Sequence, residues 1–252
     1  CICFVYICAK PTTLKEVAIK FIFFAGVAIL ISCSNSKNNT GPIRVATAAN
    51  LRFVMEEINA EFEVETGLKV EMISASSGKL TAQIKNGAPY DVFISANFKY
   101  PNTLHKEGYT KNKPVLFCKG TLVIWTNKEF IPDSTLLNLT DPDIEKIGIA
   151  NPQNAPYGIA AEELLKNLGI FDSIKAKIVF AENVSQLNQY VINKAVDIGI
   201  TAKSAVKSPK LKQTGSWKEI DPKNYSAVEE YFVKLKSKQN GNGTVESFLK
   251  FL

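Results

Sequence analysis

Asn50 and Ser77 each lie where a strand-like segment of the sequence gives way to a helical pattern. An apolar run over 45–51 ends beside Asn50, and an Ala-Ser-Ser-Gly turn at 75–78 contains Ser77. A helix start leaves backbone N–H groups without partners and carries the positive end of the helix dipole, so it can hold a small anion without lysine or arginine. The alternative is that both are ordinary capping residues that bind nothing, with Asn50 as the N-cap.

Two comparable turns follow in the second half of the chain. Tyr157 comes after a predicted strand at 146–150, and Asn183 is a plausible helix cap followed by Val184, whose backbone N–H would lie free in the first turn. Recurrence of the same kind of turn gives one shared anion site the same weight as four unrelated caps.

Other chemistry finds little support in the sequence. His105 is the only histidine, and Cys118 is the only cysteine of the predicted folded part, so neither a zinc-ligand set nor a Cys/His or Ser/His catalytic pair is evident. The net charge is +6 without long runs of like charge, which argues against nucleic acid as the partner. We therefore expect no enzyme, no cofactor and no metal-ion site.

The N-terminal segment 1–32 is predicted to be a signal peptide. An apolar run at 21–31 follows Lys15 and Lys20 and is too short to span a bilayer comfortably. The sequence Leu-Ile-Ser-Cys that ends at Cys33 resembles a bacterial lipobox, which would make Cys33 the lipidated first residue and 33–41 a tether. The alternative is a hydrophobic anchor with a chance cysteine. Residues 1–13 are expected to be upstream read-through or the edge of a fragment.

From residue 43 onward, strand patterns alternate with helical patterns, which predicts an α/β fold built from βαβ units. A long β-type stretch over 115–126 indicates a crossing from one lobe to another. We predict a first lobe made of 42–117 and 212–252 and a second lobe made of 118–211. The lysine-rich segment 203–218 is predicted to be surface, and a strand at 230–235 returns to the first lobe.

Five motifs carry a resemblance to the molybdate-binding proteins of ABC transporters. They are VATAANL at 45–51, ASSGKL at 75–80 with Gln83, GAPYDVFISA at 87–96, Asn-Pro at 151–152 with Pro-Tyr-Gly at 156–158, and AENV at 181–184. The second and third are the most specific. The resemblance runs from about residue 43 to 252, and it implies a two-lobed fold of the type II periplasmic-binding-protein kind. Each lobe would be a mostly parallel sheet flanked by helices, with the ligand in the cleft between the lobes.

The same resemblance implies a set of oxyanion ligands. Asn50 stands where many members have a serine, and its side-chain amide can still donate; Ser77 matches a hydroxyl ligand. Tyr157 and Val184 would act through their backbone N–H groups. Thr201-Ala202 stands where the best-known branch has a tyrosine, so a Thr201 hydroxyl is the candidate fifth donor. Asp91 is expected to be structural, because a carboxylate in the cleft would repel a dianion.

The implied function is an extracytoplasmic, lipid-anchored, monomeric binding protein that captures molybdate or tungstate and delivers it to an ABC permease. Two alternatives remain open at this point: the same fold binding sulfate or a phosphonate, and an enzyme or regulator on the same architecture. Members of this family usually continue beyond a helix like the one predicted at 244–252. We expect either a fragment or a trimmed lobe.

Overall fold

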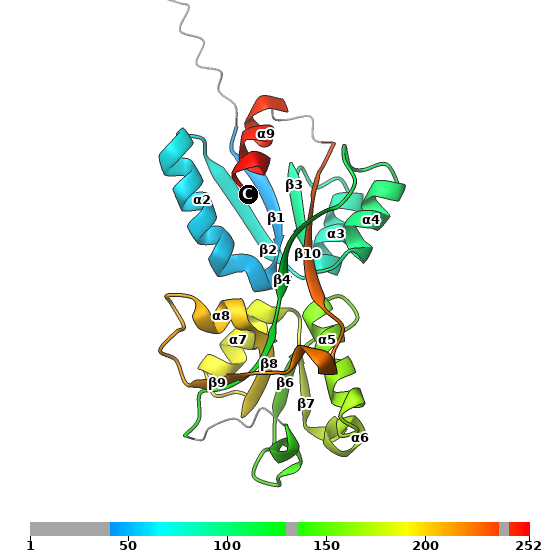
Figure 1. Ribbon diagram of the computed structural model, residues 1–252, viewed down its shortest axis with the longest axis vertical. Helices are drawn as coiled ribbons and strands as arrows, with labels where there is room; N and C mark the ends of the chain where they lie inside the picture. The colour runs from blue at the N-terminus through cyan, green and yellow to red at the C-terminus, as the bar shows by residue number, and fades with distance from the viewer. Residues whose placement is uncertain (1–40, 130–135, 237–241) are drawn as a thin grey trace, which may run out of the picture. The chain divides into compact units, whose positions relative to one another are not determined.

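The computed structural model describes residues 41–129, 136–236 and 242–252, and it contains two five-stranded sheets (Figure 1). The predicted signal peptide and Cys33 lie outside the described residues.

The first sheet has the strand order β2-β1-β3-β10-β4. Its strands are β1 (Ile43–Ala48), β2 (Val70–Ala75), β3 (Val92–Ser95), β4 (Val115–Gly120) and β10 (Val228–Lys234). β1 pairs in parallel with β2 and β3, whereas β10 pairs antiparallel with both β3 and β4. Four of the five strands therefore run in one direction, and β10 alone is reversed. The sheet is accompanied by helices α2 (Arg52–Thr66), α3 (Ser77–Lys85), α4 (Lys99–Lys106) and α9 (Asn242–Phe251).

The second sheet repeats this arrangement in the order β7-β6-β8-β5-β9. Its strands are β5 (Leu122–Thr126), β6 (Ile147–Ala150), β7 (Ile178–Ala181), β8 (Ile198–Ala202) and β9 (Ser216–Glu219). Here β5 is the reversed strand, because it pairs antiparallel with both β8 and β9. The α-helices are α5 (Pro156–Asn167), α6 (Phe171–Ile174), α7 (Val184–Ile192) and α8 (Lys203–Lys207). Short 3-10 turns lie at η1 (Ala49–Leu51), η2 (Leu137–Thr140), η3 (Lys175–Lys177) and η4 (Pro222–Asn224). The predicted two-lobed, mostly parallel α/β fold is confirmed.

The crossings between the lobes differ from the predicted boundaries. β4 remains in the first sheet as far as Gly120, and the chain enters the second sheet at Leu122, instead of crossing at 117/118. The predicted return at 211/212 is wrong, because β9 pairs with β5 in the second sheet and the chain returns only at β10. The lysine-rich composition of 203–218 concealed β9, which lies at an edge of its sheet and is partly exposed.

The first helix starts differently from the prediction. The chain forms the 3-10 turn η1 before α2, the N-cap of η1 is Ala48, and no side chain caps either element. Asn50 is therefore inside the turn and is not its N-cap. The predicted end of this helix at Gly67 is confirmed, since Gly67 adopts the left-handed conformation with φ 70°.

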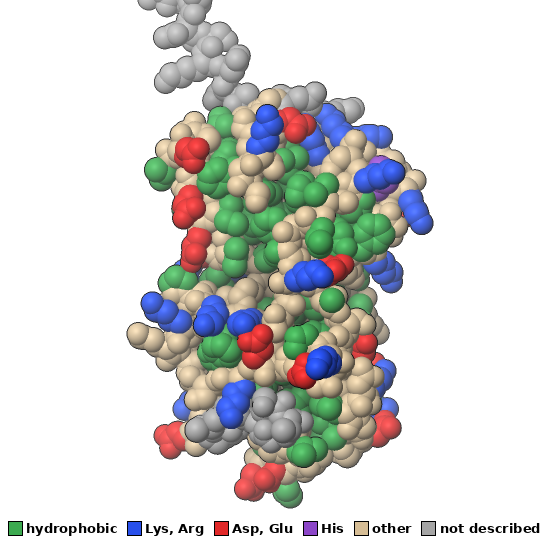
Figure 2. Space-filling view, viewed as in Figure 1, with side chains coloured by type: hydrophobic (Ala, Val, Ile, Leu, Met, Phe, Trp, Pro, Cys, Tyr) green, Lys and Arg blue, Asp and Glu red, His purple; other side chains and the backbone are tan. Residues whose placement is uncertain are grey.

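Each lobe has its own buried interior. In the second sheet β5, β6 and β8 are buried along their whole lengths, as expected for strands covered on both faces. In the first lobe Phe62 of α2 meets Phe248 of α9 edge to face, with ring centroids 5.1 Å apart, so the last helix packs on the first. The visible outer face mixes acidic and basic side chains (Figure 2).

Candidate functional site

A small cavity lies where four helix starts meet. Each of these turns follows the carboxyl end of a parallel strand: η1 follows β1, α3 follows β2, α5 follows β6 and α7 follows β7. This is the edge at which α/β sheets bind ligands. The described residues that line the cavity are Ala48, Ala49, Asn50, Ser76, Ser77, Ala96, Ala155, Pro156, Tyr157, Asn183 and Val184. None of them is charged, so any attraction for an anion must come from N–H and O–H dipoles.

Ser77 is placed with its hydroxyl hydrogen available. It is fully buried at the first position of α3, and its Oγ accepts the backbone N–H of Ala96 at 3.1 Å. The capping role belongs to the neighbouring Ser76, whose side chain accepts the Lys79 N–H. A hydroxyl has one hydrogen and two lone pairs, so Ser77 can accept from Ala96 and still donate into the cavity. The ligand interpretation of Ser77 is thus favoured over the capping one.

The second lobe offers backbone donors. In α5 the first residue, Pro156, has no N–H, and the N–H of Gly158 bonds to the Ala155 carbonyl, which leaves the Tyr157 N–H at the helix start. In α7 the Asn183 side chain accepts the Gln186 N–H at 3.0 Å and caps the helix as predicted. The Val184 N–H is one of the remaining first-turn donors. Tyr157 and Val184 are both buried and both line the cavity.

Asn50 lines the cavity too, but its side chain is engaged elsewhere. The amide nitrogen Nδ2 donates to Glu230 Oε1 at 2.6 Å, and the side chain also bonds to the Tyr157 hydroxyl. The bond to Glu230 uses one of the two amide hydrogens. The hydrogen bond to Glu230 competes with the predicted donation of this amide to a ligand, and Asn50 also offers its N–H in the first turn of η1.

Thr201 and Ala202 are not among the cavity residues. Thr201 and Ala202 belong to β8, and the Thr201 hydroxyl donates to the side chain of Asn188 in α7 at 2.7 Å, in the buried interior of the second lobe. The structure therefore does not bring the candidate fifth donor to the other four. Asp91 is structural, as predicted: its Oδ2 accepts the Arg44 N–H at 2.9 Å beside β1.

Hydrogen bonds join the two lobes around the cavity. The Gly78 N–H donates to the Asn154 carbonyl at 3.0 Å, the Ser185 hydroxyl to the Ala49 carbonyl at 3.2 Å, and the Ser204 hydroxyl to the Asn50 carbonyl at 2.7 Å. At Gly78 an added Cβ would lie 2.9–3.0 Å from Asn154, so only glycine permits this approach. Because these contacts hold the helix starts of both lobes together, a ligand here would touch both lobes.

Sequence reasoning missed Glu230. It is fully buried in β10 and lies behind Asn50, and one carboxylate oxygen, Oε2, has no hydrogen-bond partner. Burial raises the pKa of Glu230 to about 8, although the hydrogen bond from Asn50 acts in the opposite direction. A glutamate in a predicted strand is a weak indication of a functional residue. The burial of Glu230 depends on contacts with residues far away in the sequence.

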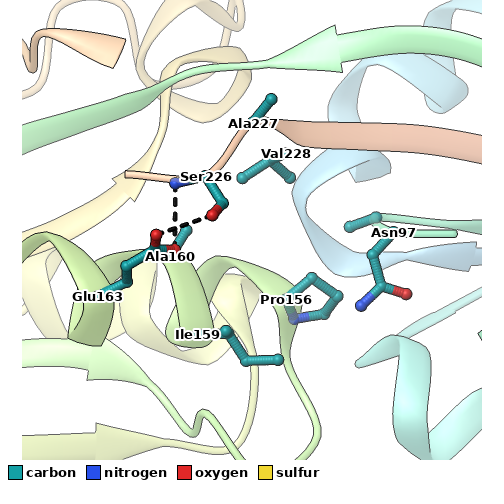
Figure 3. Close-up of a pocket in the computed structure, with 9 residues that line it drawn as sticks. Asn97, Pro156, Ile159, Ala160, Glu163, Ser226, Ala227 and Val228 are labelled. Carbon is teal, nitrogen blue, oxygen red and sulfur yellow. Dashed lines mark hydrogen bonds between the residues drawn. The ribbon is translucent and has the colours of Figure 1, made fainter. Parts of the chain in front are cut away.

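A second hollow adjoins the first and shares Ala96 and Pro156 with it (Figure 3). Two of its polar residues bind each other: the Ser226 hydroxyl and N–H donate to the two Glu163 carboxylate oxygens at 2.8 and 3.1 Å. Unlike the cavity at the helix starts, it has no set of converging donors.

Comparison with known proteins agrees with this geometry. Residues 43–252 match the family described as bacterial extracellular solute-binding protein. The chain belongs to this family. As a family of solute-binding proteins of ABC transporters, it consists of extracytoplasmic binding proteins, not enzymes. Among the described residues, none of the helices combines the length and the apolar character needed to span a membrane.

Several relatives of this chain are named as molybdate-binding proteins. The molybdate-binding protein ModA of Azotobacter vinelandii is 36% identical over 177 residues, which cover 69% of this chain and 70% of that protein. ModA of Escherichia coli strain K12 is 31% identical, covering 91% and 90%. The solved structure of the Azotobacter vinelandii periplasmic molybdate-binding protein superimposes with a TM-score of 0.78 at 32% identity, covering 83% of this chain and 91% of that one. The resemblance recognised in the sequence is confirmed.

Proposed function

We propose that this solute-binding protein captures molybdate or tungstate in the cavity at the four helix starts and delivers it to an ABC permease. The proposed donors are the N–H groups of Asn50, Ser77, Tyr157 and Val184 and the hydroxyl of Ser77. The observation that carries the proposal is that the uncharged donors of two lobes converge on one cavity. The names of the relatives support the choice of oxyanion.

The chemistry of the cavity favours a fully deprotonated tetrahedral dianion. The donors can each bond to an oxygen that carries only lone pairs, and no charged acceptor lines the cavity. Phosphate near neutral pH keeps one proton, which would face donors and remain unpaired, at a cost of roughly 1–3 kcal/mol. Sulfate carries no proton but has shorter bonds, so donors fixed on helix starts cannot all reach it at about 2.7–3.2 Å.

Calorimetric titration of the purified protein with molybdate, tungstate, sulfate, phosphate and a phosphonate tests the proposal. We expect molybdate and tungstate to bind far more tightly than the others and to raise the melting temperature at saturation. Sulfate or a phosphonate binding as tightly as molybdate would assign the alternative ligand to the same cavity. Binding that survives unchanged in Ser77→Ala would place the ligand elsewhere.

We further propose that the protein is a monomer held at the membrane through a lipid on Cys33 and that it needs no cofactor. The Leu-Ile-Ser-Cys sequence supports the lipid site. Two acyl chains give stable membrane attachment where one does not. The unaltered protein should partition into detergent, and Cys33→Ser should release it. An unaltered protein that stays in the aqueous phase would exclude the anchor. Light scattering would measure the molar mass and so test the monomer.

A further inference from the structure

Glu230 occupies an unusual place for a carboxylate in an anion-binding protein. Its Oε1 accepts the Asn50 amide at 2.6 Å, and Asn50 in turn lines the cavity proposed for the oxyanion. The side chain is fully buried, and Oε2 has no partner. An ionised carboxylate here would place a negative charge near a bound dianion, with only the Asn50 side chain between them.

The groups that face Glu230 do not neutralise such a charge. Cys118 is its cross-strand neighbour in β4, and Tyr157 of α5 bonds to the same Asn50 side chain. Gly120 lies against both Tyr157 and Glu230, since an added Cβ there would be 2.0 Å from the Tyr157 hydroxyl oxygen and 3.6 Å from Glu230 Oε1. The contacts of Glu230 in this region are therefore with neutral groups.

Three lysines share a hollow with Glu230 and are occupied by other partners. Lys119 pairs with Glu229 at 3.4 Å, Lys203 pairs with Glu219 at 2.5 Å, and Lys207 stands over the Trp217 ring at 5.3 Å. The exposure of Lys119 and Lys203 shows that this hollow reaches solvent. A proton can thus reach Glu230 from a side other than the oxyanion cavity.

We propose that Glu230 is a positioning residue of the anion site that must be neutral when the oxyanion is bound, so that at alkaline pH capture takes up a proton and release returns it. Neutral Glu230 still accepts from Asn50 through Oε1 and holds the amide away from the cavity, while the bound dianion meets only N–H and O–H donors. The proposal rests on the oxyanion function proposed above.

The pH at which this proton moves follows from the burial of the site. Burial raises the pKa of Glu230 to about 8, and the two negative charges of a bound dianion would raise it further. Proton uptake per molybdate should then be small at pH 6.5, about one half at pH 8 and close to one at pH 9. The dissociation constant should rise about tenfold between pH 7 and pH 9.

Other ionisable neighbours stay outside this window. Burial raises the pKa of the Cys118 thiol to about 11, with a further contribution from Glu230, and burial raises the pKa of the Tyr157 hydroxyl well above its ordinary value. Neither group titrates between pH 7 and pH 9, so a proton taken up there can be assigned by substitution of Glu230.

The test is calorimetry of the full chain with molybdate at pH 6.5, 8 and 9, in pairs of buffers that differ in ionisation enthalpy. Glu230→Gln, which keeps the acceptor for Asn50 but cannot ionise, should bind at every pH with the affinity of the unaltered protein at pH 6.5 and take up no proton. Glu107→Gln, which alters an exposed carboxylate that does not line this hollow, should keep the original pH profile.

The outcomes separate the two proposals. Molybdate binding without proton uptake at pH 8 and 9 in the unaltered protein overturns the role of Glu230 and leaves the oxyanion function standing. An uptake that persists in Glu230→Gln also overturns it. Absence of molybdate binding at all three pH values contradicts the oxyanion function itself. The measurement on the unaltered protein decides even if Glu230→Gln fails to fold.

Discussion

The two lobes have the same strand order and yet contribute to the site in different ways. Strands β2-β1-β3-β10-β4 correspond in order and direction to β7-β6-β8-β5-β9, with one reversed strand at the fourth place of each sheet. In both lobes the first two parallel strands of the chain lead into the helix starts that line the cavity. The shared topology accounts for the convergence of N–H groups.

Side-chain chemistry is concentrated in the first lobe. It supplies the Ser77 hydroxyl and the Asn50–Glu230 hydrogen bond, whereas the second lobe supplies backbone N–H groups at Tyr157 and Val184. The reversed strands show the same contrast, because β10 carries the buried Glu230 and β5 has the sequence LVIWT. The same fold can therefore place N–H donors through its backbone alone, while side chains in one lobe adjust the hydrogen bonding and charge around the cavity.

The largest effect is expected from Val184→Pro in the second lobe. Proline at the first position of α7 fits the helix, and Asn183 before it is already extended with φ −157° and ψ 176°. The change removes the N–H and replaces the valine side chain by the proline ring, and loss of the N–H should lower molybdate affinity by about 3 kcal/mol, on the order of 100-fold. Calorimetry measures it, and Val184→Ala is the control that keeps the N–H and should bind within about twofold. Equal losses in both variants would show that the second lobe acts through its side chain.

Ser77→Ala should weaken molybdate by about 1–3 kcal/mol, because a hydroxyl donor to a charged oxygen is lost. The adjacent Ser76→Ala removes the cap of α3 instead. It should lower the free energy of unfolding by about 1 kcal/mol, and the melting temperature with it, and change the affinity little. Titration and thermal unfolding of both variants separate binding from folding. A larger affinity loss in Ser76→Ala would reverse the roles of the two serines.

The smallest effect is expected at the ion pair between the lobes. Lys79 and Glu182 meet at 2.5 Å but are about half exposed, so Lys79→Ala should cost less than about 1 kcal/mol of binding. The effect should disappear in high salt, where exposed pairs are screened. Lys85→Ala breaks a comparably exposed pair with Glu107 inside the first lobe and should leave affinity unchanged. Equal effects of both changes would indicate general charge loss and not coupling of the lobes.

Much of the site was predictable because a free N–H at a helix start is a local property. Asn183 could be recognised as a cap and Val184 as the next residue from the sequence alone, and the structure agrees. Local signals failed at α4, which was not predicted, and at β9, where lysines on an edge strand resembled a surface segment. In both cases the decisive contacts come from other parts of the chain.

The sequence by itself determined most of the alternation of strands and helices, the Asn183 cap of α7 and the family, since these depend on neighbours a few residues apart. Only the tertiary structure decided what each polar side chain does. Asn50 and Glu230 are 180 residues apart, and their contact turns the amide away from the cavity and buries a carboxylate. Thr201 is likewise taken by Asn188. The physical reason is that a backbone donor is fixed by its own helix, whereas a side chain hydrogen-bonds to whichever buried partner the packed lobes bring within reach.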